Sequence, residues 1–109
     1  MIPFEITPQE VKQRLDRGEK LRLVDVREPA EFQVAHIEGS ELIPMRSIPE
    51  NLQSFLDEEA PLVFFCHHGM RSLHVLNWLR EHGLETGSSM QGGIDRWSLE
   101  IDASVPQYS

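Results

Sequence analysis

The sequence predicts an α/β fold with a short, mostly parallel central sheet and helices on both of its faces. Short apolar segments alternate with segments of helical periodicity, which is typical of parallel strands joined by helices. One apolar run, residues 61–65, holds Val and two Phe between a proline and a glycine-containing turn, as in a strand buried on both faces. The 109 residues suffice for one core. We therefore expect a single domain over residues 1–109, with its core in 1–101 and an extended tail in 102–109.

Capping residues predict the first helix. Thr7 suits the N-cap, and Glu10, three residues later, completes a capping box. Pro8 fits the first helical position, and Gly18 ends the helix. A short apolar strand is expected next, over residues 21–26.

Prolines divide the following segment into short elements. Pro29 begins a helix over residues 29–34, and Pro44 stops a brief strand over residues 40–44. A helix over residues 48–57 is expected to carry three apolar side chains on one side, namely Leu52, Phe55 and Leu56.

The C-terminal part repeats the alternation of helix and strand. A helix from about residue 70 to 82 ends at Gly83, and residues 86–90 are expected to form the last strand. The helix from about residue 70 to 82 is expected to turn three side chains inward: Leu73, Leu76 and Leu79. A final helix begins at the Gly92 and Gly93 pair and carries the apolar residues Ile94, Trp97 and Leu99.

Charge and composition exclude some functions. The formal net charge of -8 argues against binding to nucleic acid and to anionic membrane surfaces, because both are negatively charged. No apolar run approaches the roughly 20 residues that a bilayer-spanning helix needs. Residues 1–5 lack the basic start and apolar core of a signal peptide, so we expect a cytoplasmic protein.

The chain has one cysteine and five histidines. One cysteine excludes an internal disulfide and any zinc site built from several cysteines, and a free thiol suits the reducing cytosol. The histidines do not form a spaced metal-binding signature, since His67 and His68 are adjacent in sequence. We therefore expect no bound metal and no cofactor.

The single cysteine, Cys66, lies where the buried strand ends and a helix begins. The first amides of a helix lack intrahelical acceptors and carry the positive end of its dipole, so they favour a thiolate. Arg71 and the two histidines add donors, and Gly69 permits a backbone turn that aims amides inward. A lone buried cysteine is more often inert, but these neighbours favour a reactive thiol in an electropositive, part-exposed setting.

Three segments, in order and at matching spacing, resemble the rhodanese domain of sulfurtransferases, and together they cover nearly the whole chain. The second segment, residues 66–72, fits the family pattern Cys-x-x-Gly-x-Arg-Ser. The sequence departs from the family pattern at Ala35 and Ser40, where glycine and alanine are usual. The other two segments comprise residues 24–28 with 31–32, 35–40 and 43–44, and residues 91–94 with Trp97.

This resemblance implies a rhodanese-like domain that transfers sulfur. Cys66 would take a sulfane sulfur from thiosulfate or another small donor, carry it as a persulfide, and pass it to cyanide in vitro or to a cellular thiol or protein. Asp25 and Arg27, at the end of the strand over residues 21–26, match a family Asp-x-Arg and are expected to brace the fold near the site. The expected substrate-binding residues form the loop after the cysteine: His67, His68, Gly69, Met70, Arg71 and Ser72.

Two alternatives remain open. Rhodanese-like phosphatases and arsenate reductases share this fold and also use a loop from cysteine to arginine. Their loops have five intervening residues, whereas four separate Cys66 from Arg71 here, and the shorter ring suits a single sulfur atom. The other alternative is a non-enzymatic module for sulfur relay or regulation; such modules often lack the cysteine that this chain retains.

Overall fold

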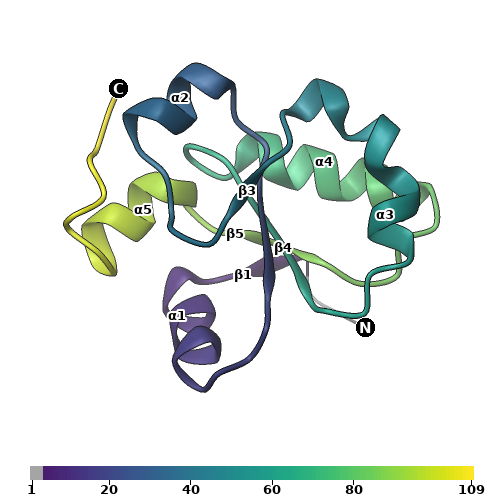
Figure 1. The fold of residues 1–109 in the computed structure, drawn as a ribbon, viewed down its shortest axis with the longest axis horizontal. Helices are drawn as coiled ribbons and strands as arrows, with labels where there is room; N and C mark the ends of the chain where they lie inside the picture. Colours follow the sequence, from purple (N-terminus) through teal and green to yellow (C-terminus); the bar gives the residue numbers. More distant parts are fainter. Residues whose placement is uncertain (1–3) are drawn as a thin grey trace.

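Five parallel strands form one sheet at the centre of the molecule (Figure 1). The computed structural model describes residues 4–109; the first three residues of the predicted domain lie outside the described part. The strand order is β1-β5-β4-β2-β3, with β4 in the middle, and the expected α/β class is confirmed. The strands are β1 (Glu5–Ile6), β2 (Arg22–Asp25), β3 (Glu41–Leu42), β4 (Leu62–Phe65) and β5 (Ser88–Met90).

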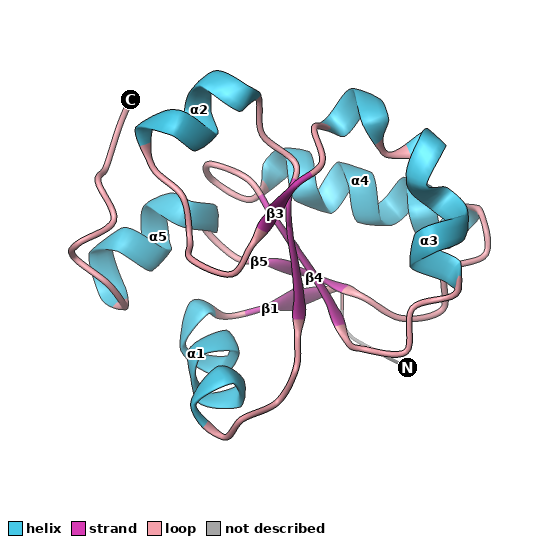
Figure 2. Ribbon diagram, viewed as in Figure 1, coloured by secondary structure: helices cyan, strands magenta, loops and turns pink. Residues whose placement is uncertain are grey.

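Helices cover both faces of this sheet (Figure 2). One hydrophobic cluster joins α3 and α4 to the sheet through Phe55, Leu76 and Phe64. A second cluster joins α1 and α5 to the opposite face through Val11 and Ile94. The helices are α1 (Pro8–Asp16), α2 (Pro29–Val34), α3 (Leu52–Leu56), α4 (Met70–Glu81) and α5 (Gly93–Glu100), with 3-10 turns η1 (Met45–Ser47) and η2 (Pro49–Asn51) before α3.

The central strand β4 is buried on both faces, as predicted. Its four residues are all at most 2% exposed. Leu62 and Phe64 belong to the first cluster, and Val63 and Phe65 to the second, because successive side chains of a strand point to opposite faces. Apolar packing on both sides therefore fixes the position at which β4 ends and Cys66 follows.

The carboxyl ends of the parallel strands meet at one edge of the sheet. Cys66 directly follows β4, and Arg27 comes two residues after β2. Gly92 and Gly93 come two and three residues after β5. Groups far apart in sequence therefore gather at the edge where open α/β sheets place their ligands.

Local details differ from the expectations in three places. β1 was not predicted, because a strand of two residues carries no alternation; it forms by pairing with β5. The expected helix over residues 48–57 is instead two 3-10 turns followed by the short helix α3. Leu56 and Leu99 are 37% and 63% exposed, because each is one residue beyond a buried one and the helix turns it about 100° away.

The tail beyond α5 packs against the body of the molecule. Val105 is buried in the second cluster, and its carbonyl oxygen accepts a hydrogen bond from the Ser98 hydroxyl. The expected division at residue 101 therefore does not separate core from tail. Within residues 4–109, none of the helices has the length and apolar character needed to cross a bilayer.

Candidate active site

Cys66 is buried, with only 1% of its surface exposed, and it lies in a ring of hydrogen-bond donors. The Gly69 amide donates to the sulfur at 3.1 Å and the Ser72 amide at 3.4 Å. The Ser72 hydroxyl donates to the same sulfur at 3.6 Å. The expectation of a part-exposed thiol is thus wrong, because the loop closes over Cys66. The donors aimed at its sulfur nevertheless distinguish Cys66 from a cysteine packed only among hydrocarbon side chains.

Gly69 makes this closure possible. It is the residue before α4 and adopts a left-handed backbone with φ of 105°. A Cβ at this position would lie 3.2 Å from the Gly92 amide nitrogen, a tight contact, and the positive φ would strain any other residue. The turn directs the Gly69 amide back at the sulfur and starts α4, whose first-turn amides lack helical acceptors.

Backbone amides at the N-terminus of α5 donate hydrogen bonds to the backbone of the cysteine loop. The Ile94 amide donates to the Cys66 carbonyl at 2.8 Å, and the Asp95 amide donates to the His67 carbonyl at 3.1 Å. Gly93 permits these bonds, because a Cβ there would lie 2.3 Å from the Cys66 carbonyl oxygen. The backbone of the cysteine is therefore fixed by a second helix.

Arg71 is paired with Glu31 of α2. Its two terminal nitrogens donate to the two carboxylate oxygens at 2.8 and 2.9 Å. The Arg71 hydrogen bonds lower the pKa of Glu31 to about 2, and Glu31 in turn raises the pKa of Arg71. The Glu31 carboxylate therefore offsets the positive charge expected from Arg71. The groups that donate to the sulfur itself are two backbone amides and one hydroxyl.

Asp25 and Arg27 form a fully buried ion pair at the end of β2. The Arg27 side chain donates to both Asp25 oxygens, at 2.8 and 2.5 Å, and to the Ala35 carbonyl at 2.7 Å. Burial alone lowers the pKa of Arg27, but the bonds to Asp25 and Tyr108 outweigh it and raise that pKa. This geometry supports a bracing role, since the pair ties β2 to the segment after α2.

Tyr108, in the tail, was missed by sequence reasoning. Its hydroxyl accepts from Arg27 and donates to Glu31, each at 2.8 Å. Burial is the main cause that raises the pKa of Tyr108 to about 12. Nothing in the sequence marks this tyrosine, because it lies 42 residues after Cys66 in a segment without periodicity.

The two histidines of the loop differ in environment. His67 stacks on the Tyr108 ring at 4.0 Å between centroids and 8° between planes. Burial, and then the neighbouring His68, lower the pKa of His67, so it is neutral at pH 7. His68 is exposed, and Met70, at 77%, projects into solvent at the start of α4.

The fold also brings Asp95 to these histidines. Ligand atoms of His67, His68 and Asp95 lie within 4.8 Å of one another, a grouping that the sequence does not reveal because Asp95 belongs to a different helix. The two imidazole rings are tilted by 35° with their centroids 3.8 Å apart, and the nearest His68–Asp95 approach is 3.8 Å.

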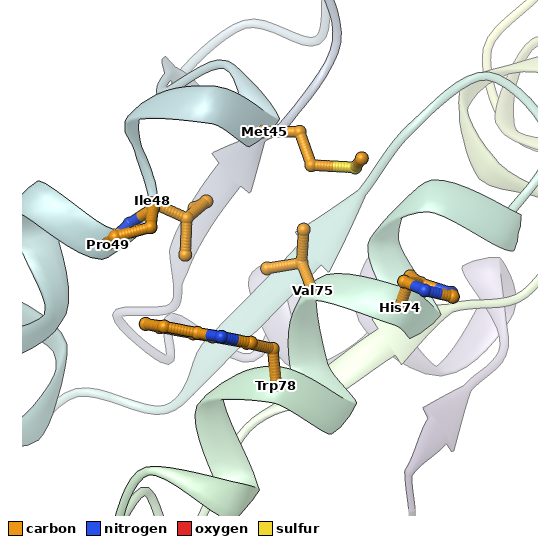
Figure 3. A pocket seen from close by; sticks show the side chains of 6 residues that line it. All are labelled: Met45, Ile48, Pro49, His74, Val75 and Trp78. Atoms are coloured by element: carbon orange, nitrogen blue, oxygen red, sulfur yellow. The ribbon is translucent and has the colours of Figure 1, made fainter.

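An apolar pocket of about 180 Å³ lies beside α4, separate from the Cys66 loop (Figure 3). Val75 and Trp78 form its floor on α4, and Met45 and Ile48 face them from the other side. Pro49 and His74 complete its lining. None of these residues belongs to the loop over residues 66–72, so this pocket is not the thiol site.

Known proteins with similar sequences carry names that fit this site. The chain is 36% identical over 105 residues to the probable adenylyltransferase/sulfurtransferase MoeZ of Mycobacterium tuberculosis, covering 94% of this chain and 26% of MoeZ. The chain thus spans about a quarter of that relative. It is 34% identical over 92 residues to the thiosulfate sulfurtransferase GlpE of Pseudomonas aeruginosa, covering 84% of this chain and 81% of GlpE.

Solved structures agree with the fold. A rhodanese-like domain protein from Staphylococcus aureus is 31% identical, covers the whole of both chains, and superposes with a TM-score of 0.80. The family model of the rhodanese-like domain matches residues 7–100, which include strands β2 to β5, the cysteine loop and the whole of α5, but not β1 or the tail. On these grounds the chain belongs to the rhodanese-like domain family.

Proposed function

We propose that this protein is a sulfurtransferase that moves a sulfane sulfur from thiosulfate, or a related donor, through a persulfide on Cys66 to a thiophilic acceptor. The observation that carries the proposal is the ring of donors around the sulfur, formed by the Gly69 and Ser72 amides and the Ser72 hydroxyl. The sulfurtransferase names of MoeZ and GlpE support the reaction class, and the name of GlpE supports thiosulfate as donor.

The first half-reaction loads the cysteine. The Cys66 thiolate attacks the outer sulfur of thiosulfate, a new S–S bond forms, and the old S–S bond breaks. Sulfite leaves with the bonding electron pair, and the terminal sulfur of the persulfide carries the negative charge. The donors aimed at the Cys66 sulfur stabilise the attacking thiolate and are in place before the reaction, and removing such a donor typically costs about 100-fold or more in rate.

The second half-reaction removes the transferred sulfur from Cys66. An acceptor such as cyanide attacks the terminal sulfur, thiocyanate forms, and the electron pair of the broken S–S bond returns to Cys66 as a thiolate. The chain has no second cysteine that could attack the persulfide and form an internal disulfide. The sulfur therefore passes to an external acceptor, which is a cellular thiol or a protein.

A relay module that serves a protein partner is the second candidate. It is favoured by the deep burial of Cys66, which limits direct access for small donors, and by the likeness to part of MoeZ. A phosphatase is disfavoured, because the loop holds four residues between Cys66 and Arg71 and closes tightly around one sulfur atom.

A steady-state assay distinguishes the sulfurtransferase, the relay module and the phosphatase. With thiosulfate and cyanide, the unmodified protein is expected to form thiocyanate, and Cys66→Ser is expected to form none. The relay reading predicts negligible turnover of small donors together with a stable partner protein retained by Cys66→Ser. Hydrolysis of a chromogenic phosphate ester without thiocyanate formation would overturn the sulfurtransferase proposal in favour of a phosphatase.

A further inference from the structure

The C-terminal tail reaches the candidate active site although it lies outside the family match, which ends at residue 100. Val105 anchors the tail in the core, with the Ser98 hydroxyl bonded to its carbonyl oxygen. Gln107 donates to Asp95 at 3.2 Å. These contacts hold the tail against α5 and bring the next residue, Tyr108, to the loop.

The Tyr108 hydroxyl links two charged pairs. It accepts a hydrogen bond from Arg27, which is paired with Asp25, and it donates one to Glu31, which is paired with Arg71. The Glu31 oxygen that accepts from Tyr108 also accepts from Arg71 at 2.9 Å. One hydroxyl therefore connects the brace at the end of β2 with the arginine at the start of α4.

The Tyr108 ring contacts the other side of the loop. It lies flat on the His67 imidazole, the residue directly after the cysteine, and it stands 5.7 Å from the Arg27 guanidinium carbon. A single side chain thus touches the first residue of the loop and, through Glu31, its last charged residue. Both residues belong to the loop that begins at Cys66.

We propose that Tyr108 is a positioning residue that holds His67 and the Glu31–Arg71 pair in fixed places around Cys66, and so tunes recognition of an anionic sulfur donor. The inference rests on the proposed sulfurtransferase function and extends it to a segment beyond the family match. The hydroxyl acts as a donor to Glu31 throughout the neutral range, since burial keeps it protonated.

Kinetics of the full chain test this role with Tyr108→Phe, which keeps the ring and removes the hydroxyl. We expect the KM for thiosulfate to rise about threefold to tenfold, the range of one typical hydrogen bond, with kcat within about twofold. Tyr108→Ala removes the stack as well and is expected to have the larger effect. Ser104→Ala, at an exposed tail residue whose hydroxyl bonds to Asp102, serves as the control with unchanged constants.

A second measurement does not depend on sulfur transfer. The ratio of Cys66 alkylation rates with anionic iodoacetate and neutral iodoacetamide reports the charge arrangement around the sulfur. We expect the two Tyr108 variants to change this ratio severalfold and Ser104→Ala to leave it unchanged. If the unmodified protein formed no thiocyanate, the proposed function would fail while this ratio still tested the placement of the charges.

A purely structural role predicts a different pattern. Loss of folded protein scales kcat and leaves both the KM and the alkylation ratio as they are, because the remaining folded molecules keep the same site. Unchanged KM and unchanged alkylation ratio in both Tyr108 variants would therefore overturn the proposal.

Discussion

The N-termini of α4 and α5 are alike in construction and opposite in use. Each helix follows a parallel strand of the same sheet, and each is preceded by a glycine in the left-handed conformation, Gly69 with φ of 105° and Gly92 with φ of 72°. Neither has a side-chain cap, so the first amides of both helices are available to other partners. At α4 the partner is the Cys66 sulfur, and at α5 it is the backbone of the cysteine loop.

The comparison shows how one local motif serves as a site in one place and as a scaffold in the other. The difference lies in what the strand edge presents to each helix: a thiol before α4, and two carbonyl groups of Cys66 and His67 before α5. Changes at α5 are therefore expected to affect stability together with activity. Changes at α4 are expected to affect activity more than stability.

The largest effect is expected for Gly93→Ala at the α5 end. The new methyl group would collide with the Cys66 and His67 carbonyls, at 2.3 and 2.5 Å, and the residue would also be held at φ of 60°. We expect a loss of about 3 kcal/mol or more in the free energy of unfolding, from overpacking plus left-handed strain, with loss of sulfur transfer. Urea denaturation measures the first and thiocyanate formation the second.

Gly39→Ala is the matched control for this substitution. Gly39 has a similar positive φ of 87° but no neighbouring atom within 4 Å of a Cβ. It should cost only about 1–2 kcal/mol, from the backbone conformation alone. Equal stability losses at residues 93 and 39 would contradict the scaffold role of α5.

Gly69→Ala tests the α4 end. A Cβ there would meet the Gly92 nitrogen at 3.2 Å, a tight contact that a small backbone shift relieves, but that shift turns the Gly69 amide from the sulfur. We expect a loss of transfer rate on the order of 100-fold, with a stability cost of about 1–2 kcal/mol. Gly18→Ala, with φ of 85° and open space, should match the stability cost and keep full activity. Full activity of Gly69→Ala would show that this amide is dispensable.

Ser72→Ala separates the hydroxyl from the amide of the same residue. It removes the side-chain donor 3.6 Å from the sulfur and the 2.7 Å bond to the buried Ser89 hydroxyl. We expect a loss of about 1–2 kcal/mol in stability and roughly a tenfold loss in transfer rate. Ser89→Ala breaks the same serine pair and leaves the donor to the sulfur, so it should lose similar stability with near-normal activity. Equal activities of the two variants would contradict a role for the hydroxyl.

The smallest expected effect concerns the ion pair between Glu31 and Arg71. Because Arg71 lowers the pKa of folded Glu31 to about 2 from an ordinary 4.5, Glu31 stabilises the fold above about pH 4.5, and this contribution is lost as the pH falls toward 2. Glu31→Gln should therefore be less stable at pH 7 by about 1–2 kcal/mol and show a flatter decline in unfolding free energy between pH 4.5 and 2.5. The exposed Glu38→Gln should retain the decline of the unmodified protein. Parallel pH profiles for Glu31→Gln and the unmodified protein would rule out this pairing.

Local sequence signals predicted the parts of this molecule that depend on neighbours in the chain. The burial of β4 on both faces and the start of α4 near residue 70 both follow from short-range patterns. The burial of Cys66 was not predictable, since it depends on how tightly the loop closes. Tyr108 and Asp95 were missed because only the folded sheet edge brings α5 and the tail to the cysteine loop.

The central claim is that a sulfur held by inward-facing donors carries a transferable sulfur atom. Intact-mass spectrometry after exposure to thiosulfate tests it most directly, with Cys66→Ser measured in parallel. We expect the unmodified protein to gain the mass of one sulfur atom, to lose it again on addition of cyanide, and the variant to gain none. An unchanged mass after thiosulfate, or a gain of the same size in Cys66→Ser, would contradict the account.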